Sequence, residues 1–297
     1  MDKIIAIDKP KDYTSRDIVN IVSKKLNTKK AGHTGTLDPL ATGILVICTN
    51  KYLKLVENLM NHDKEYIAEV IFGIETDTLD ITGNILNKKE KQISKEELIK
   101  VLDSFKGKSI QEVPKYSAVK VNGKKLYEYA RNGIEVELPK KEIEVYDIEL
   151  LDFNDNKFTF KCHVSKGTYI RSLIRDIGYK LNTYACMTNL RRTKLGKVTL
   201  NDINTLEDIE NNNIKELNPV DILELDKEVI SDDKIINKIK NGCKLNKSIK
   251  VGILITPYCL AKSLCLSTSI LIISISISSL KSSKTGDNIL QGPHQVA

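Results

Sequence analysis

Residues 31–43 read Ala-Gly-His-Thr-Gly-Thr-Leu-Asp-Pro-Leu-Ala-Thr-Gly, and this stretch is the most informative part of the chain. Its only ionisable side chains are His33 and Asp38. Three glycines permit backbone angles that are closed to other residues, and Pro39 fixes the backbone directly after Asp38. The stretch therefore predicts a stiff loop that presents one carboxylate, a candidate nucleophile. Taken alone, an Asp in such a turn more commonly caps the element that follows it.

The residues on either side of this loop alternate between strand and helix patterns. Ser94 and Glu97 predict a capping box at the start of one helix, and Thr14 with Asp17 opens another. No strict strand-helix-strand rhythm is present, which favours an α+β fold around a mixed, mostly antiparallel sheet. Strands are expected at 4–7, 44–48, 64–73 and 158–164, and helices after Thr14, over 95–105 and over 170–181.

The composition is that of a globular protein with a polyanionic partner. The chain has 297 residues, of which 41% are apolar and 29% charged, enough for one large domain with a smaller one. Its formal net charge is +7, yet the segment from Asn201 to Asp233 holds eleven acidic residues and two lysines. The positive excess therefore lies on the part that contains residues 31–43. Such a balance suits phosphate contacts, and a solvated lysine-rich surface is the alternative interpretation.

Cysteine usage and the N-terminus give two further expectations. The six cysteines form no C-x-x-C pair and have no His at metal-ligand spacing, so neither a zinc site nor a disulfide framework is expected. The first residues do not resemble a signal peptide, so we expect a cytoplasmic protein. The cysteines are Cys48, Cys162, Cys186, Cys243, Cys259 and Cys265.

The last part of the chain, 251–297, is atypical because it is rich in Ser and Ile. Residues 263–280 carry no charge, which reaches the lower limit for a membrane span. Eight of these positions are Ser or Thr, and Ser and Ile alternate over 274–278 with the period of a strand, so we expect no membrane contact. The abrupt change in composition favours a third interpretation, in which this stretch is not native coding sequence.

Residues 31–43 closely resemble the catalytic loop of the TruB family of tRNA pseudouridine synthases, and further family motifs follow in the same order. The resemblance covers about residues 3–225 and implies the pseudouridine synthase fold over 1–225, with an RNA-gripping insertion at about 111–141. It also implies that 226–250 begin a small C-terminal RNA-binding domain, which 251–297 do not complete. The further motifs are Lys64-Glu65-Tyr66, the run 73–83, Tyr116-Ser117-Ala118-Val119-Lys120, Gly167-Thr168-Tyr169-Ile170-Arg171 and Leu190-Arg191-Arg192-Thr193.

The resemblance assigns the catalytic roles to three residues. Asp38 is the implied nucleophile, and whether it attacks the sugar or the base stays open. A buried carboxylate without a partner is hard to keep ionised, so a cation is expected beside it, and Arg171 is the candidate for a bidentate contact. Tyr66 matches the family tyrosine that stacks on the target base and accepts its carbon-bound proton.

The resemblance also implies substrate contacts. His33 matches the residue that takes part in flipping the target nucleotide, Tyr169 a second pocket tyrosine, and Leu190 the leucine that lines the uracil pocket. Lys9 and Pro10 match an N-terminal RNA-contacting motif. Arg191-Arg192 add to the basic face, and Asp12 stands where the family usually has glycine, in a turn that an Asp tolerates.

By this resemblance the substrate is the uridine at position 55 in the T loop of tRNA, bound by a monomer that needs no cofactor or metal. Two other classes stay open. An RNA-binding or tRNA-folding protein without turnover would keep the basic surface and would not need Asp38. A glycoside hydrolase using Asp38 would need a second carboxylate as acid, which the motif does not supply.

Overall fold

A computed structural model describes residues 2–223, 227–229, 234, 237 and 253–255. Contacts divide the chain into two compact units, Met1–Glu224 and Leu225–Ala297. Of the second unit, the structure describes a short parallel pair, β15 (Lys227–Val229) with β16 (Ile253–Ile255). The expectations for the rest of 226–250 and 251–297, including the uncharged stretch 263–280, lie outside the described residues.

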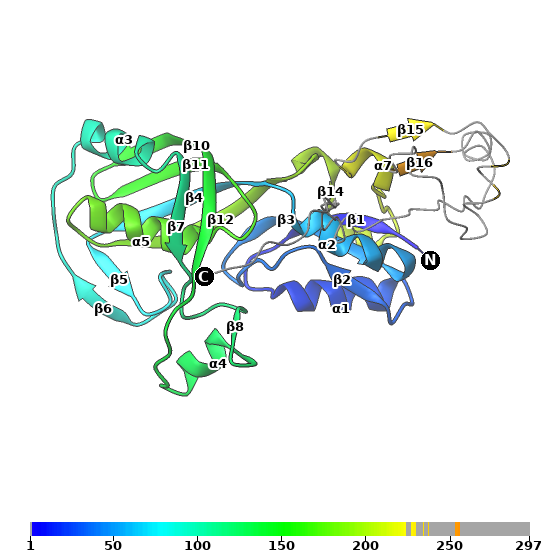
Figure 1. The fold of residues 1–297 in the computed structure, drawn as a ribbon, viewed down its shortest axis with the longest axis horizontal. Helices are drawn as coiled ribbons and strands as arrows, with labels where there is room; N and C mark the ends of the chain where they lie inside the picture. The colour runs from blue at the N-terminus through cyan, green and yellow to red at the C-terminus, as the bar shows by residue number, and fades with distance from the viewer. Residues whose placement is uncertain (1, 224–226, 230–233, 235–236, 238–252, 256–297) are drawn as a thin grey trace, which may run out of the picture. The chain divides into compact units, whose positions relative to one another are not determined.

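The first unit is built on one long mixed sheet with the strand order β14-β1-β3-β12-β4-β11-β10-β7 (Figure 1). Two pairings on this path are parallel, β1 with β14 and β3 with β12, and the others are antiparallel. The predicted mixed, mostly antiparallel sheet of an α+β fold is confirmed. The strands are β1 (Ile4–Lys9), β3 (Thr42–Thr49), β4 (Lys64–Phe72), β7 (Gly107–Glu112), β10 (Lys140–Asn154), β11 (Lys157–Val164), β12 (Ala185–Leu195) and β14 (Ile203–Asn204), with β2 (Ala31–His33) beside β3 and β13 (Val198–Thr199) beside β12.

The helices begin at the predicted caps. The capping box of Thr14 and Asp17 is present, whereas at α3 only its first half forms. Ser94 accepts the Glu97 amide, but the Glu97 carboxylate pairs with Lys91 at 2.7 Å instead of returning to the cap. None of the described helices is long and apolar enough to cross a membrane. The helices are α1 (Ser15–Lys25), α2 (Val56–Met60), α3 (Lys95–Asp103), α4 (Leu126–Arg131), α5 (Ile170–Lys180), α6 (Leu206–Glu210) and α7 (Pro219–Ile222), with the 3-10 turns Asn50–Leu55 and Leu200–Asp202.

Two apolar clusters hold the helices against the sheet. In one, α3 and α5 cover the half formed by β4, β10, β11 and β12, and in the other α1 and α6 pack with β1 and β3 (Figure 1). The helical spacing in α5 predicts this, since Leu173, Ile174 and Ile177 are all buried. The sheet therefore has two packed halves that meet at the β3–β12 junction.

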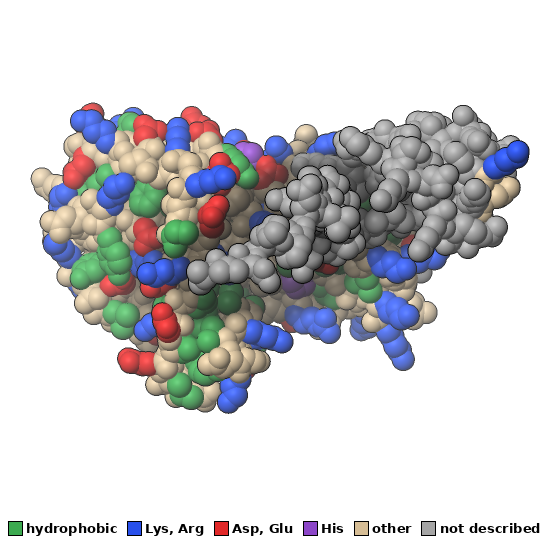
Figure 2. All heavy atoms as spheres, viewed as in Figure 1, with side chains coloured by type: hydrophobic (Ala, Val, Ile, Leu, Met, Phe, Trp, Pro, Cys, Tyr) green, Lys and Arg blue, Asp and Glu red, His purple; other side chains and the backbone are tan. Residues whose placement is uncertain are grey.

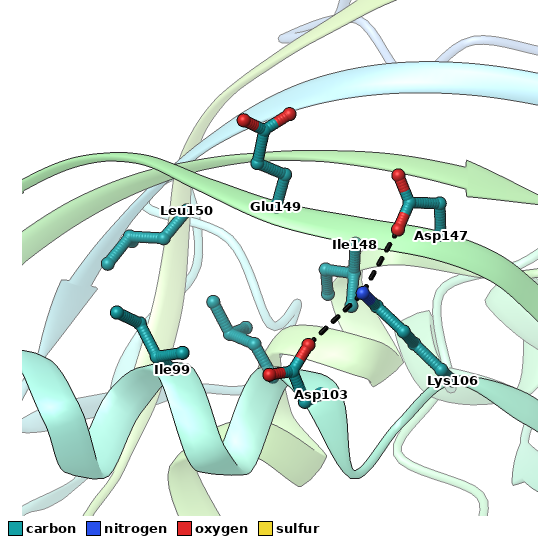
Figure 3. Close-up of a pocket in the computed structure, with 8 residues that line it drawn as sticks. Ile99, Asp103, Lys106, Asp147, Ile148, Glu149 and Leu150 are labelled. Carbon is teal, nitrogen blue, oxygen red and sulfur yellow. Dashed lines mark ion pairs between the residues drawn. The ribbon is translucent and has the colours of Figure 1, made fainter.

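The outer edge of α3 lies along β10 (Figure 3). Lys106, just beyond the helix, pairs with Asp103 and with Asp147 of β10, each at 3.1 Å. These pairs are solvent-exposed and contribute little to stability, so α3 is held mainly by the burial of Leu98 and Leu102.

Gly43 lets the two halves of the sheet meet. It pairs with Arg192 across the parallel contact between β3 and β12, and its φ is +96°. A Cβ atom added there would lie 2.3 Å from the carbonyl oxygen of Arg192 and 2.9 Å from its amide nitrogen. Both partners are backbone atoms, so the strands would have to separate.

We therefore expect Gly43→Ala to lower the free energy of unfolding by about 3 kcal/mol or more, combining the left-handed backbone cost with the clash. Gly107→Ala is the matched control, because Gly107 has nearly the same φ, +99°, and nothing lies within 4 Å of its added Cβ. The control should lose only about 1–2 kcal/mol. Urea denaturation of both variants measures the difference, and equal losses would contradict the close-approach argument.

The predicted insertion leaves the sheet between β7 and β10. Lys140 pairs with Glu112, and the Val113 amide donates to the Pro139 carbonyl at 3.0 Å, which closes the base of the excursion. It carries α4 and a small hairpin of β8 (Lys120–Val121) with β9 (Lys124–Lys125), and it projects from the sheet (Figure 1). A second hairpin, β5 (Ile74–Thr76) with β6 (Ile85–Lys88), follows β4.

Candidate active site

Five of the predicted site residues meet at one cavity of about 510 Å³, within the size range of ligand-binding sites. Its walls come from the loop 34–38, from β4 and β12, from the insertion and from the start of α5. The five are Asp38, Tyr66, Tyr169, Arg171 and Leu190.

Asp38 and Arg171 form the bidentate contact that the sequence suggested. Arg171 Nε lies 2.8 Å from Asp38 Oδ2, and Nη2 lies 3.2 Å from Oδ1. The Arg171 side chain is 6% exposed and that of Asp38 is 35% exposed, so the carboxylate faces the cavity from a buried support. Two parallel bonds fix both its position and its orientation.

Arg171 also holds two other segments. Its Nη1 donates to the Thr78 carbonyl at 2.8 Å, and its Nη2 donates to the Tyr116 carbonyl at 3.0 Å. One guanidinium therefore joins the Asp38 loop, the loop after β5 and the base of the insertion. Spacing along the chain gives no sign of these two partners, because both are backbone oxygens.

The Asp38 loop is tied to the N-terminal turn on both sides of the carboxylate. Ser15 Oγ accepts the Leu37 amide at 2.8 Å and donates to the Leu37 carbonyl at 3.1 Å. The Asp12 amide donates to the Pro39 carbonyl at 2.8 Å. Asp12 has a φ of +69°, the left-handed conformation that the family's usual glycine would adopt.

Lys9 is placed differently from the expected RNA contact. Its side chain is 0% exposed, and its ammonium donates to the carbonyls of Pro10, Tyr13 and Pro39 at 2.8, 2.7 and 3.2 Å. Burial lowers the pKa of Lys9 to about 8. All three donors are occupied by the loop, so Lys9 supports the Asp38 segment and has no free donor for a phosphate. Pro10 takes part through its carbonyl and does not line the cavity.

Tyr66 and Leu190 lie side by side on the sheet. Tyr66 is on β4 and Leu190 on β12, where it pairs with Ala68, two residues beyond Tyr66 on the same face. Both are largely buried. They form an aromatic and an aliphatic surface that a flat base could contact.

Tyr169 is fixed by a residue that the sequence did not single out. It is the cap residue before α5, and its amide and carbonyl are both bonded to the Gln111 side chain, at 2.8 and 3.1 Å. Burial raises the pKa of the Tyr169 hydroxyl. A lone Gln at the start of a predicted insertion offers no recognisable signal of this role.

His33 does not line the cavity. The flanking glycines suggested an exposed loop, but residues 31–33 form the short strand β2, where His33 pairs with Ile47 and is half-buried. Its Nδ1 accepts the Gly35 amide at 3.3 Å. Burial and the charges of Arg192 and Arg16 lower the pKa of the imidazole.

Arg191 and Arg192, which were expected to add to a basic face, are placed differently from each other. Arg191 is paired with Asp8 at 3.0 and 2.9 Å, and Arg192 is buried and lines the cavity. Lys64 also lines the cavity, and its position two residues before Tyr66 on one face of a strand could have signalled this.

Comparisons with known proteins match this chain to one family. The model of the TruB family pseudouridylate synthase N-terminal domain matches residues 23–170, and that of the tRNA pseudouridylate synthase B C-terminal domain matches 171–230. The tRNA pseudouridine synthase B of Clostridium tetani is 44% identical over 248 residues, which cover 82% of this chain and 86% of the relative. That of Fusobacterium nucleatum is 50% identical over 200 residues, covering 67% and 70%. The chain belongs to the TruB family of pseudouridylate synthases. It is accordingly an enzyme of the isomerase class.

Solved structures agree with the TruB assignment. The chain in the archaeal box H/ACA sRNP Nop10-Cbf5 complex aligns with a TM-score of 0.61 at 26% identity, covering 86% of this chain and 75% of that one. The chain in a Cbf5-Nop10-Gar1 complex aligns with a TM-score of 0.56 at 32% identity, covering 70% of this chain. This chain spans only 54% of the latter.

The described part of the cavity lining contains one acid. Of the described residues that line it, Asp38 is the only carboxylate. Glycoside hydrolysis needs two carboxylates flanking the scissile bond, so the cavity does not fit that alternative. Elsewhere among the described residues, no group of three or more His, Cys, Asp or Glu is placed to hold a metal ion.

Proposed function

We propose that this protein converts the uridine at position 55 in the T loop of tRNA to pseudouridine, with Asp38 as the nucleophile. The observation that carries the proposal is the bidentate Asp38–Arg171 pair at a cavity whose described lining residues include no second acid. The tRNA substrate is supported by relatives named tRNA pseudouridine synthase B that are 41–50% identical to this chain.

The proposed reaction breaks the bond between N1 of uracil and C1′ of the ribose, turns the base and joins C5 to C1′. The proton on C5 is lost, and N1 gains a proton, so the product is an isomer of the substrate. The Asp38 carboxylate forms a covalent bond either to the sugar or to the base, which divides one difficult step into two. Tyr66 stacks on the uracil and accepts the C5 proton, while Leu190 and Tyr169 keep the detached base in place.

Base flipping is part of the proposal, because Asp38 lies in the wall of a cavity and a base stacked within an RNA loop would not reach it. His33 immediately precedes the cavity loop 34–38, where a flat polar ring can occupy the space that the base leaves. In the insertion, Tyr127 lines the cavity and lies 5.3 Å from Lys125 Nζ and 5.4 Å from the Arg131 guanidinium, measured to the ring centroid. Aromatic rings beside cations suit stacking and phosphate contact with the T stem-loop.

The proposed domain organisation places this site in the first and larger domain. Residues 1–225 form the catalytic domain with the RNA-gripping insertion at 111–141, and 226–250 begin a small C-terminal domain. Figure 2 shows several Lys and Arg side chains around the surface formed by α1, which adds to the electrostatic attraction for tRNA. We further propose a monomer that acts in the cytoplasm without a cofactor or metal.

The test is conversion of an unmodified tRNA transcript by the purified protein. We expect pseudouridine at position 55, detected by a pseudouridine-specific chemical mapping method, and none in a transcript that carries cytidine there. An isolated T stem-loop tests whether the rest of the tRNA is needed. Absence of pseudouridine from position 55, or its appearance only elsewhere, would refute the proposed target.

We expect Tyr66→Phe to lower the conversion rate by about a hundredfold or more, because the ring still stacks but the group that accepts the C5 proton is gone. Affinity for the T stem-loop should stay close to that of the unchanged protein. Single-turnover rates and binding titrations separate the two effects. A variant with full activity would leave Tyr66 a stacking role only.

A further inference from the structure

The cavity is strongly electropositive once its ion pair is counted. Among the residues that the structure describes, four cationic side chains line it, namely those of Lys64, Lys141, Arg171 and Arg192, against the single carboxylate of Asp38. Arg171 is committed to Asp38. Uracil is a neutral base, so the proposed chemistry on it does not require the other three cations.

Two of these cations are buried without an acid. Arg192 is 1% exposed, and its Nε and Nη2 donate to the carbonyls of Ile44 and Gly35, at 2.7 and 3.2 Å. Lys64 is 8% exposed and donates to the carbonyls of Met60 and His62. Neither side chain forms an ion pair with a carboxylate of the described residues. Burying a charge without an opposite charge is costly, so both side chains favour an anion at the cavity.

A buried hydroxyl without a partner lies at the same wall. Thr34 is fully buried and lines the cavity, and its Oγ1 has no hydrogen-bond partner among the described residues. The next residue, Gly35, has a φ of +147°, and a Cβ there would lie 3.6 Å from Arg192 Nη1. Buried hydroxyls normally form a hydrogen bond, so the Thr34 hydroxyl is available to donate one to a ligand.

The strand register places Lys64 and Arg192 beside the surface proposed for the base. Lys64 and Tyr66 are on one face of β4, two residues apart, and Arg192 is the direct cross-strand partner of Tyr66. An anion held here would therefore be next to the uracil that stacks on Tyr66. In RNA, the anion nearest to a base is a phosphate of its own backbone.

We propose that Thr34, Lys64 and Arg192 form a subsite for an RNA backbone phosphate adjacent to the uridine that is isomerised. This inference rests on the proposed function. Lys64 and Thr34 donate hydrogen bonds to the phosphate oxygens, and the buried charge of Arg192 strengthens the attraction. The subsite holds the flipped nucleotide by its backbone, so the base is positioned without a hydrogen bond to its reacting atoms.

The test uses a T stem-loop in which one phosphate flanking the target uridine, on its 5′ or its 3′ side, is replaced by an uncharged methylphosphonate. Binding is measured in the Asp38→Asn background, so that it does not depend on turnover. We expect one of the two replacements to weaken binding by about tenfold. Adding Lys64→Met should weaken binding of the normal RNA to a similar extent and abolish the effect of that replacement.

Lys161→Met is the matched control, because Lys161 lies on the neighbouring strand β11, pairs with Glu65 at 2.9 Å and does not line the cavity. It should preserve the full effect of the methylphosphonate. Thr34→Val, which removes only the hydroxyl, should reduce that effect in part and serves as a second variant if Lys64→Met does not fold. The subsite is refuted if, for both Lys64→Met and Thr34→Val, the loss of binding free energy from the substitution simply adds to the loss from the methylphosphonate.

Affinity should also depend on pH through Lys64. Burial and the charge of Arg192 lower the pKa of Lys64 to about 8, with Lys166 acting in the same direction and Asp63 opposing it. A bound phosphate favours the charged ammonium, so affinity should fall as the pH rises through about 8. Lys64→Met should lack this decline, and an equal decline in both proteins would contradict the assignment.

The outcomes also separate this inference from the proposed function. The phosphate subsite would be supported, and the activity refuted, if the binding losses were non-additive but the unsubstituted protein formed no pseudouridine. The activity would be supported, and the phosphate subsite refuted, if position 55 were converted normally but the binding losses were additive.

Discussion

Asp38→Asn will lower the rate of pseudouridine formation by at least about a thousandfold, because an amide oxygen is a far weaker nucleophile than a carboxylate. The substitution keeps the shape of the side chain and one acceptor for Arg171. Arg171 also keeps its bonds to the carbonyls of Thr78 and Tyr116, so the cavity wall should stay in place. Affinity for tRNA should therefore change little. Single-turnover conversion and a filter-binding titration measure the two quantities on the same preparation.

Asp147→Asn provides the control for the loss of one acid. Asp147 lies on β10, pairs with Lys106 and does not line the cavity, so its variant should convert tRNA at the unchanged rate. Turnover by Asp38→Asn close to that of the unchanged protein would refute the nucleophile assignment. Loss of tRNA binding together with turnover would instead show that Asp38 organises the RNA site.

Arg171→Lys should also reduce conversion by about a thousandfold, although it conserves the charge. A lysine cannot form two parallel bonds to Asp38 and also reach the carbonyls of Thr78 and Tyr116, which Arg171 does with its planar fork. The nucleophile would lose its fixed orientation, so the single-turnover rate should fall much more than the RNA affinity. Circular dichroism and urea denaturation verify that the variant folds.

Arg175→Lys is the matched control for this second change. Arg175 lies one turn further along α5 and is also paired with acids, Glu112 at 2.9 Å and Asp176 at 2.8 Å, but it does not line the cavity. It should lose some stability and keep its turnover within about threefold, since the reacting groups are untouched. Equal loss of turnover in both variants would mean that α5 is sensitive to any such change, and Arg171 would have no special role.

Local secondary structure and family membership could be predicted from the order of the residues alone. The apolar spacing along 170–181 and the alternation over 158–164 follow from the fixed geometry of helix and strand, so α5 and β11 were predicted to within a residue or two. The ordered motifs around Asp38, Tyr66 and Arg171 marked the TruB family because each contains several specific residues at a fixed spacing.

Which side chains meet at the cavity, and which are buried, depends on how the folded elements pack together. Lys9 and Arg192 were both expected from the sequence to be basic residues facing RNA, yet the Lys9 ammonium is bonded to three carbonyls while Arg192 lines the cavity. Their partners are backbone oxygens and distant strands, and any residue type can supply a carbonyl. Asp38 and Arg171 are 133 residues apart and meet only in the folded sheet, whose two halves join where Gly43 of β3 lies close to Arg192 of β12. Burial and long-range pairing depend on that assembly, whereas spacing along the chain reports only local geometry.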